Sequence, residues 1–174
     1  EFEKSKVRLR MKTMLGLKLK VNKKLIWSEF GPVLKNKKGY FSFQSNAFEN
    51  ISSIDQWYQM NKSTNWSEFK SALEQNHLAM FNIIYADKQD NIFYVSNGKM
   101  PYRNPDPKYH WNSTLPGNTR ATLWDKFKPF NELPQHLNPQ SGYLFNTNHS
   151  PFMASDTRSN LNPAKYDFKD GFET

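Results

Sequence analysis

The sequence of 174 residues contains no cysteine. This absence excludes disulfide bonds, a thiolate nucleophile and a cysteine-ligated zinc site. No apolar run approaches the roughly 18 consecutive residues of a membrane-spanning helix, and residues 1–10 lack the apolar centre of a signal peptide. The seven glycines are scattered, and they form neither a phosphate-binding loop nor a GxSxG nucleophile elbow. We therefore expect no membrane partner and no nucleotide cofactor.

The metal-ligand types are also sparse. None of the four histidines lies two or four positions from another, which is the spacing that puts two zinc ligands on one face of a strand or helix. Carboxylates pair at Asp87/Asp90 and at Asp167/Asp170, in segments where aspartate is typical of turns. The sequence alone therefore predicts no metal site.

Basic and aromatic residues are abundant. Residues 1–38 hold 12 Lys/Arg and three Asp/Glu, whereas the rest of the chain holds 12 and 13. Within that basic segment, Lys and Arg alternate with Val, Leu and Met, which is typical of strands with one solvated face. No aromatic residues are interleaved with them, so the pattern favours a solvated face over a nucleic-acid patch. The 14 Phe, eight Tyr and five Trp supply a core for a single domain.

Periodicity along the chain predicts an α+β fold. Residues 1–45 are expected to form antiparallel strands, with residues 24–35 as a strand interrupted at Gly31-Pro32. Residues 52–76 fit two short amphipathic helices. Ser52 or Ser53 would cap the first helix, and Asn65 with Glu68 has the capping-box spacing for the second.

The second half of the chain is predicted to contain three different segments. Residues 79–97 read as a hairpin, with strands Phe81–Ala86 and Ile92–Val95 around a loop of Asp and Asn. Residues 101–139 are proline-containing and loop-rich, and such a long irregular stretch often carries function. Residues 140–152 are expected to form a strand whose polar end reaches an active site.

That polar end supplies the candidate site. Asn146 and Asn148 follow the apolar residues 143–145 and precede Ser150-Pro151. A carboxamide there has the chemistry to donate a hydrogen bond to a developing oxyanion. The alternative is that an Asn before Ser-Pro simply forms a turn.

Several segments in the same order resemble the β-chain of the penicillin acylase family of N-terminal nucleophile (Ntn) hydrolases. The matching pieces are FGPV (30–33), WSEFKSAL (66–73), NIIYADKQDNIFYVSNGKMPYR (82–103), LPG (115–117), ELPQHLNPQSGYLFNTNHSPF (132–152) and ASD (154–156). The block from Asn138 to Pro151 is the most specific, and the resemblance covers residues 24 to 156 or so.

The resemblance implies part of a four-layer αββα sandwich. In this family a precursor cleaves itself, and the new N-terminal Ser attacks an amide carbonyl with its own α-amino group as general base. By position, Asn148 corresponds to the family's oxyanion donor, and Asn146 is a second candidate on the same strand face. The substrates implied are N-acylated compounds, penicillin-like or N-acyl-homoserine-lactone-like, and the aromatic loop at residues 101–130 would form a rim of the acyl pocket.

Residue 1 is Glu, which cannot be this nucleophile. We therefore expect a fragment of the acylase β-chain that is a single partial domain over residues 1–174 and is inactive alone. Its partners would be the α-chain and the N-terminal part of the β-chain. No cofactor is required for catalysis, but the resemblance admits a structural calcium ion in the full protein, with Asp156 as one ligand. The family analogy also implies a periplasmic or secreted location.

The rival interpretation is a stand-alone module that binds a carbohydrate or peptide through exposed aromatic side chains. A module would close its own core, whereas a fragment exposes a large apolar face or an open sheet edge. A third interpretation, nucleic-acid binding through residues 1–38, predicts strongly salt-dependent affinity.

Overall fold

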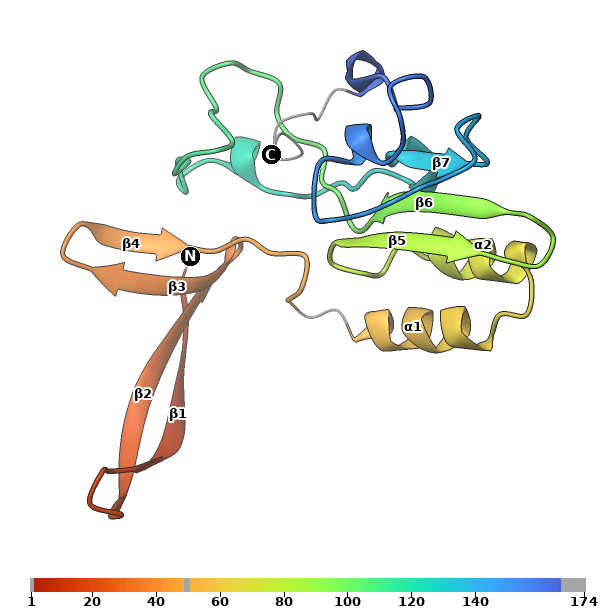
Figure 1. Cartoon of the computed structure of the whole chain (residues 1–174). Helices are drawn as coiled ribbons and strands as arrows, with labels where there is room; N and C mark the ends of the chain where they lie inside the picture. Colours follow the sequence, from red (N-terminus) through yellow and green to blue (C-terminus); the bar gives the residue numbers. More distant parts are fainter. Residues whose placement is uncertain (1, 49–50, 167–174) are drawn as a thin grey trace. The chain divides into compact units, whose positions relative to one another are not determined.

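The computed structural model describes residues 2–48 and 51–166 (Figure 1). The chain divides into two compact units: Glu1–Ser45 with Pro116–Leu123, called the strand unit here, and Asn46–Leu115 with Trp124–Thr174, called the helix–sheet unit. That both units belong to one partial domain of a larger protein stays a prediction. Within the described ranges, no helix has the length and apolar character that crossing a bilayer requires.

The strand unit is an antiparallel meander, which confirms the prediction for residues 1–45. Its strands are β1 (Glu3–Lys12), β2 (Lys18–Ser28), β3 (Gly31–Asn36) and β4 (Gly39–Ser42), in the order β1-β2-β3-β4. The interruption expected at Gly31-Pro32 lies two residues earlier, because β2 runs on to Ser28 and Pro32 pairs with Trp27 inside β3. The ion pair between Glu29 and Arg120, at 2.9 Å, ties the β2–β3 turn to residues 116–123.

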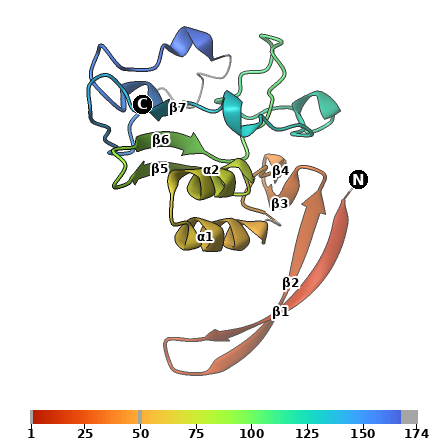
Figure 2. The same ribbon diagram turned by 90° about the vertical axis from the view of Figure 1, so that its right-hand side faces the viewer.

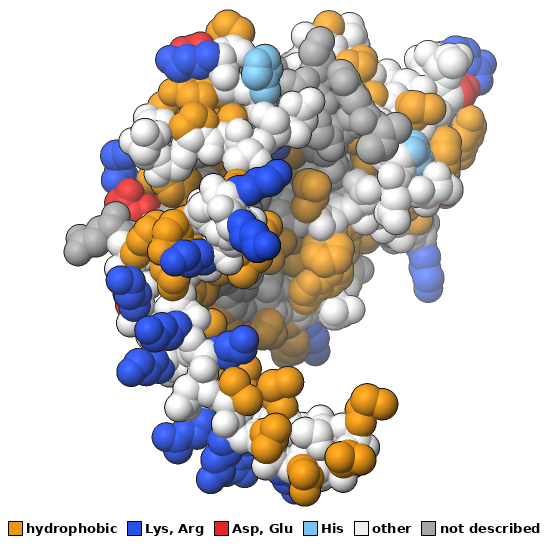
Figure 3. Space-filling model, turned by 90° about the vertical axis from the view of Figure 1, so that its left-hand side faces the viewer, with side chains coloured by type: hydrophobic (Ala, Val, Ile, Leu, Met, Phe, Trp, Pro, Cys, Tyr) orange, Lys and Arg blue, Asp and Glu red, His pale blue; other side chains and the backbone are white. Residues whose placement is uncertain are grey.

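The hairpin of β1 and β2, called the ribbon below, has two chemically opposite faces. In its register Leu9 lies opposite Val21, and Arg10 lies opposite Lys20. Because side chains alternate across a strand, one face is apolar and the other is cationic, as Figure 3 shows in orange and blue. The apolar face consists mainly of Val7, Leu9, Met11, Leu19, Val21 and Leu25. Met11 and Leu19 are each 52% exposed, so the strand unit by itself leaves much of this face uncovered.

The helix–sheet unit contains a three-stranded antiparallel sheet in the order β5-β6-β7. The strands are β5 (Phe81–Ala86), β6 (Ile92–Asn97) and β7 (Gln135–Leu137), which confirms the predicted hairpin. The Asp87 carboxylate accepts hydrogen bonds from the backbone of Gln89 and Asn91 in its turn. Asp90 adopts the left-handed φ of 61° that such a turn requires.

Two helices, α1 (Ser52–Lys62) and α2 (Trp66–Glu74), confirm the prediction for residues 52–76. They lie on one side of the sheet in Figures 1 and 2. The core between them includes Leu73, Ile83, Phe93 and Val95. The side chains that alternate with these strand residues, among them Asn82 and Tyr94, belong to the opposite face of the sheet.

The two predicted helix caps have different outcomes. The Asn65 side chain accepts a hydrogen bond from the Glu68 backbone N–H at 3.0 Å, as expected. The Glu68 carboxylate accepts a hydrogen bond from the backbone N–H of Thr64, the residue before the cap. The serine cap of α1 is wrong, because the N-cap is Ile51 and no side chain forms a cap hydrogen bond there.

The remaining chain is mostly irregular. Residues 101–139 contain two short 3₁₀ helices, Arg120–Thr122 and Phe130–Glu132, before β7, so the loop-rich prediction is confirmed. Two further 3₁₀ helices follow at Pro151–Met153 and Pro163–Lys165. The strand predicted over residues 140–152 is wrong, because this segment is irregular up to the 3₁₀ helix at its end. Asn and Ser side chains there bond to their own backbone and compete with strand pairing.

Candidate functional site

The candidate site is a loop, residues 143–154, that follows β7. The Phe145 backbone N–H donates to the Ala154 carbonyl at 3.0 Å and closes the loop. The loop is fixed to the sheet by a hydrogen bond from the Asn82 Nδ2 of β5 to the Asn146 Oδ1, at 3.3 Å. The loop therefore lies on the sheet face opposite the two helices.

Asn148 occupies the tip of this loop in an uncommon backbone conformation. Its φ is +59°, in the left-handed region, which Asn tolerates better than most residues. Its side chain is exposed, and no hydrogen bond joins its carboxamide to another described residue. The side-chain N–H groups of Asn148 are thus available to an acceptor from outside this part of the chain.

Two other asparagines with left-handed backbones provide a comparison. Asn76 and Asn138 have φ values of 51° and 47°. The Asn76 Nδ2 donates to the Lys128 carbonyl, and the Asn138 Oδ1 accepts from the Ile92 N–H at 2.8 Å. Both carboxamides are used for structure, whereas the Asn148 carboxamide has no such use among the residues described.

Asn146 is held in a different way from its neighbour. Its Oδ1 accepts a hydrogen bond from the Asn148 backbone N–H at 2.9 Å, which is an Asx turn. The two residues therefore face each other across a turn. The sequence-based prediction that they share one face of a strand is wrong. With its oxygen bonded both to Asn148 and to Asn82, Asn146 supports the position of Asn148.

His149 stabilises the same turn, a role that its place in the motif alone did not predict. Its Nδ1 accepts from the Thr147 backbone N–H at 3.0 Å, which leaves the Nε2 to donate to the Met153 carbonyl at 2.9 Å. The ring stacks on Phe145 with centroids 4.7 Å apart. These contacts join the two sides of the loop around Asn148.

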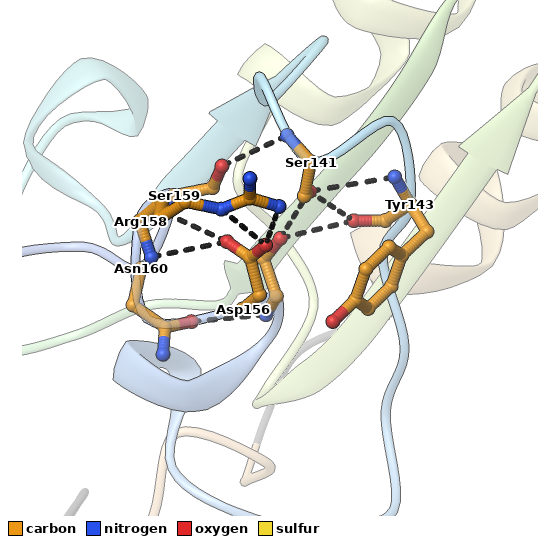
Figure 4. A network of polar contacts seen from close by, with 7 residues as sticks. Ser141, Tyr143, Asp156, Arg158, Ser159 and Asn160 are labelled. Carbon is orange, nitrogen blue, oxygen red and sulfur yellow. Dashed lines mark hydrogen bonds and ion pairs between the residues drawn. The ribbon is translucent and has the colours of Figure 1, made fainter.

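The base of the loop is closed by a network of polar side chains, shown in Figure 4. The hydroxyls of Ser141 and Ser155 lie 2.5 Å apart, and the Ser155 hydroxyl also donates to the Tyr143 carbonyl. Next to them, the Asp156 carboxylate forms an ion pair with Arg158 at 2.6 Å. The Arg158 hydrogen bond holds the pKa of the Asp156 carboxyl below its usual value.

The described residues do not form a metal site. They contain no group of three or more His, Cys, Asp or Glu side chains placed to hold an ion. Both Asp156 oxygens accept hydrogen bonds from Arg158 or its backbone, and Asp87 is used by its turn. The pair Asp167/Asp170 lies outside the described residues. A calcium ion held by Asp156 with ligands from elsewhere in the full protein stays a prediction.

A surface hollow of about 340 Å³ lies between α1 and α2. It is lined by polar residues of those helices and of the segment that joins them, among them Ser63, Ser67 and Glu68. None of the candidate asparagines lines it, so this hollow is not the site predicted from the sequence.

The whole-chain comparison identifies the class of protein to which this fold and loop belong. The family model for penicillin amidase matches residues 1–171, so the chain belongs to the penicillin amidase family. Its mixed α and β architecture, with antiparallel sheets and two helices, matches the Ntn fold of penicillin acylases.

Two relatives show the extent of the similarity. The chain is 36% identical to penicillin G acylase of Escherichia coli over 111 residues, which is 61% of this chain and 12% of that protein. Among solved structures, it is similar to the thermostable penicillin G acylase from Alcaligenes faecalis, with a TM-score of 0.73 and 25% sequence identity. That match covers 92% of this chain and 29% of the other. The chain thus spans only a small part of either relative.

Proposed function

We propose that this chain is part of an acylase-type amidohydrolase that cleaves the linear amide bond of N-acylated substrates. The substrate class is penicillin-like or N-acyl-homoserine-lactone-like. The nucleophile is an N-terminal Ser that lies outside this chain. The observation that carries the proposal is Asn148, a left-handed asparagine in a family-specific block whose exposed carboxamide bonds to no other described residue.

The proposed reaction has two steps. The Ser hydroxyl adds to the substrate carbonyl carbon as its proton passes to the α-amino group, and the carbonyl oxygen becomes an oxyanion. An Asn148 Nδ2–H donates to that oxyanion. The C–N bond then breaks, the amine leaves with the proton, and the acyl group stays on the Ser oxygen. Water adds to the ester in the same way and releases the acid.

The shape of the Asn148 turn supports this role. An oxyanion donor contributes most when it is fixed before the reaction, since no reorganisation is then needed in the transition state. Asn146 and His149 hold the backbone on both sides of Asn148. The donor is therefore on a loop, but on a loop that is stabilised by its own side chains.

The apolar face of the ribbon favours a fragment of a larger enzyme over the stand-alone binding module. Leu9, Met11 and Leu19 are 42%, 52% and 52% exposed on one side of a two-stranded hairpin. Monomeric proteins rarely leave such contiguous apolar patches uncovered. The family model includes the ribbon, and the relatives are several times longer than this chain. We therefore assign the cover of this face to the rest of the acylase polypeptide.

Further features of the full protein belong to the same proposal. By family analogy it is exported to the periplasm or secreted and is produced by self-cleavage of a precursor. Catalysis requires no cofactor. Exposed residues of the loop at 101–130, such as Tyr102, contribute to the rim of the acyl pocket.

The test is an Asn148→Gly substitution in the full-length acylase, assayed with a chromogenic N-acyl anilide. Glycine accepts a φ of +59° without strain, so the change removes the carboxamide and keeps the turn. Loss of one oxyanion donor costs about 2.7–4 kcal/mol in the transition state, or roughly 100- to 1,000-fold in kcat. We expect KM to stay nearly constant, because the donor acts on charge that develops only during the reaction.

The matched control is Asn138→Gly, which makes the same change at another left-handed asparagine of the same sequence block. This variant should keep kcat within about twofold, because Asn138 bonds to a strand N–H and its loss affects mainly stability. A kcat for Asn148→Gly equal to that of this control would show that Asn148 is only a turn former.

A further inference from the structure

A continuous line of hydrogen bonds connects the central strand of the sheet, β6, to Asn148. The Tyr94 hydroxyl of β6 donates to the Asn82 Oδ1 at 2.9 Å. The Asn82 Nδ2 donates to the Asn146 Oδ1 at 3.3 Å, and the Asn148 N–H donates to the same oxygen at 2.9 Å. The three side chains come from two strands and a loop, and Asn82 and Asn146 are 64 positions apart in the sequence.

The direction of every bond in this line follows from one backbone group. A backbone N–H only donates, so the Asn146 atom that faces Asn148 is the oxygen. The Asn82 atom that faces this oxygen is then its nitrogen, and the Asn82 oxygen faces Tyr94. Tyr94 is 1% exposed, and burial raises the pKa of its phenol, so the hydroxyl stays protonated and donates.

We propose that Asn82 is a positioning residue for the oxyanion donor: its amide N–H sets the orientation of Asn146, and Asn146 in turn holds the Asn148 turn. This inference rests on the proposed function of Asn148. It extends that function to a β5 residue which has no contact with the reacting atoms. Tyr94 completes the line by fixing the orientation of the Asn82 carboxamide.

The proposal makes an isosteric substitution unusually informative. Asn82→Asp replaces the donating nitrogen by an oxygen of the same size, so two acceptors face each other. Asn146 can relieve this only by rotating its carboxamide, so that its nitrogen points toward the new carboxylate. The same nitrogen then faces the Asn148 N–H, and two donors oppose each other. The Asx turn breaks in either case. In the full-length acylase at pH 8, we expect kcat to fall about 10- to 100-fold, a part of the loss expected for removal of the donor itself, with little change in KM.

The pH profile distinguishes positioning from general loss of structure. A protonated Asp carries an O–H that donates to the Asn146 oxygen in place of the missing amide. The kcat of the variant, divided by that of the unchanged enzyme at the same pH, should therefore rise about fivefold or more between pH 8 and pH 4, because a carboxyl of ordinary pKa, about 3.9, is close to half protonated at pH 4. A variant that is merely damaged gives a constant ratio, and a constant ratio would overturn the proposal.

A second variant keeps the test meaningful if Asn82→Asp fails to fold. Tyr94→Phe removes one hydroxyl, and the Asn82 carboxamide is then able to rotate and exchange its oxygen and nitrogen. We expect kcat to fall about two- to fivefold at unchanged KM, as expected for one neutral hydrogen bond. The matched control is Tyr85→Phe, the same change on the neighbouring strand, where the hydroxyl donates to Asp87 in the hairpin turn. Its kcat should be unchanged.

The outcomes separate this inference from the function on which it rests. If Asn148→Gly lowers kcat and neither Asn82→Asp nor Tyr94→Phe does, Asn148 is the donor and the positioning role is refuted. If Asn148→Gly leaves kcat unchanged, the proposed function itself fails.

Discussion

Gln56 provides a test of how the helices are fixed to the sheet. Its side chain is fully buried on α1. The Oε1 accepts from the backbone N–H groups of His77 and Leu78, at 2.6 and 3.1 Å. The Nε2 donates to the Asn97 Oδ1 at the end of β6, at 3.1 Å. One side chain thus joins the first helix, the segment after the second helix and the central strand.

The substitution Gln56→Leu conserves much of the volume and removes all three bonds. The Leu78 N–H and the Asn97 side chain, both 0% exposed, lose a partner in places that water does not reach. Each such buried group costs about 1–3 kcal/mol. His77 is only half-buried and adds less. We expect a loss of about 3–5 kcal/mol in the free energy of unfolding, a large fraction of the typical 5–15 kcal/mol.

The assays are urea unfolding and thermal unfolding of the 174-residue chain, both followed by tryptophan fluorescence. At about 2–4 °C per kcal/mol for a chain of this size, Tm should fall by roughly 10 °C. Gln59→Leu is the matched control, since Gln59 lies one turn further along α1 with its side chain exposed, and it should change stability by no more than about 0.5 kcal/mol. Equal losses for the two variants would refute the reasoning that the Gln56 bonds stabilise this junction.

Two further predictions concern the base of the candidate loop and the ribbon. The Asp156 pKa is lowered by Arg158, so their pairing stabilises the fold above the unfolded carboxyl pKa of about 3.9 and is lost as the pH falls through the folded value. Asp156→Asn should therefore reduce the urea midpoint at pH 7 and have a vanishing effect near pH 2; a constant difference at both pH values would contradict this. For the ribbon, Leu9→Cys and Arg10→Cys should react with a maleimide at similar rates in the isolated chain, because both side chains are exposed. In the full-length acylase, peptide mass spectrometry should show that labelling of Leu9→Cys slows at least about tenfold while Arg10→Cys stays reactive, because only the apolar face is buried. Equal labelling of the two variants would show that the apolar face is uncovered, and would refute the proposal that the rest of the acylase polypeptide covers it.

Elements that depend on local periodicity could be predicted from the sequence. The alternating strands within residues 3–28 and the hairpin around Asp87 to Asn91 appear at nearly the expected positions. Asn65 caps α2 as its spacing with Glu68 indicated. In these cases the pattern that forms the element lies within the element, so distant contacts have little influence on it.

The loop that carries the proposed oxyanion donor was predicted less well. Residues 143–145 are apolar and favour a strand by propensity, but propensity is overridden when side chains offer the backbone other partners. The Asn146 oxygen and the His149 ring each accept from a backbone N–H two residues away. These hydrogen bonds between residues close in sequence bend the chain into a turn. The backbone N–H groups that they use are no longer available to a neighbouring strand.

A turn holds Asn148 rigid in a different way from a strand. A strand would hold the carboxamide through backbone pairing, and the turn holds it instead through side chains that come from β5, β6 and the loop itself. An oxyanion donor must be fixed in both cases, but the residues whose substitution would loosen it are different. If the donor stood on a strand, a change of Asn82 would matter little. Because the proposed donor stands on a turn whose Asx oxygen accepts a hydrogen bond from Asn82, we expect a single N–H at the sheet face to control how well that donor stabilises an oxyanion.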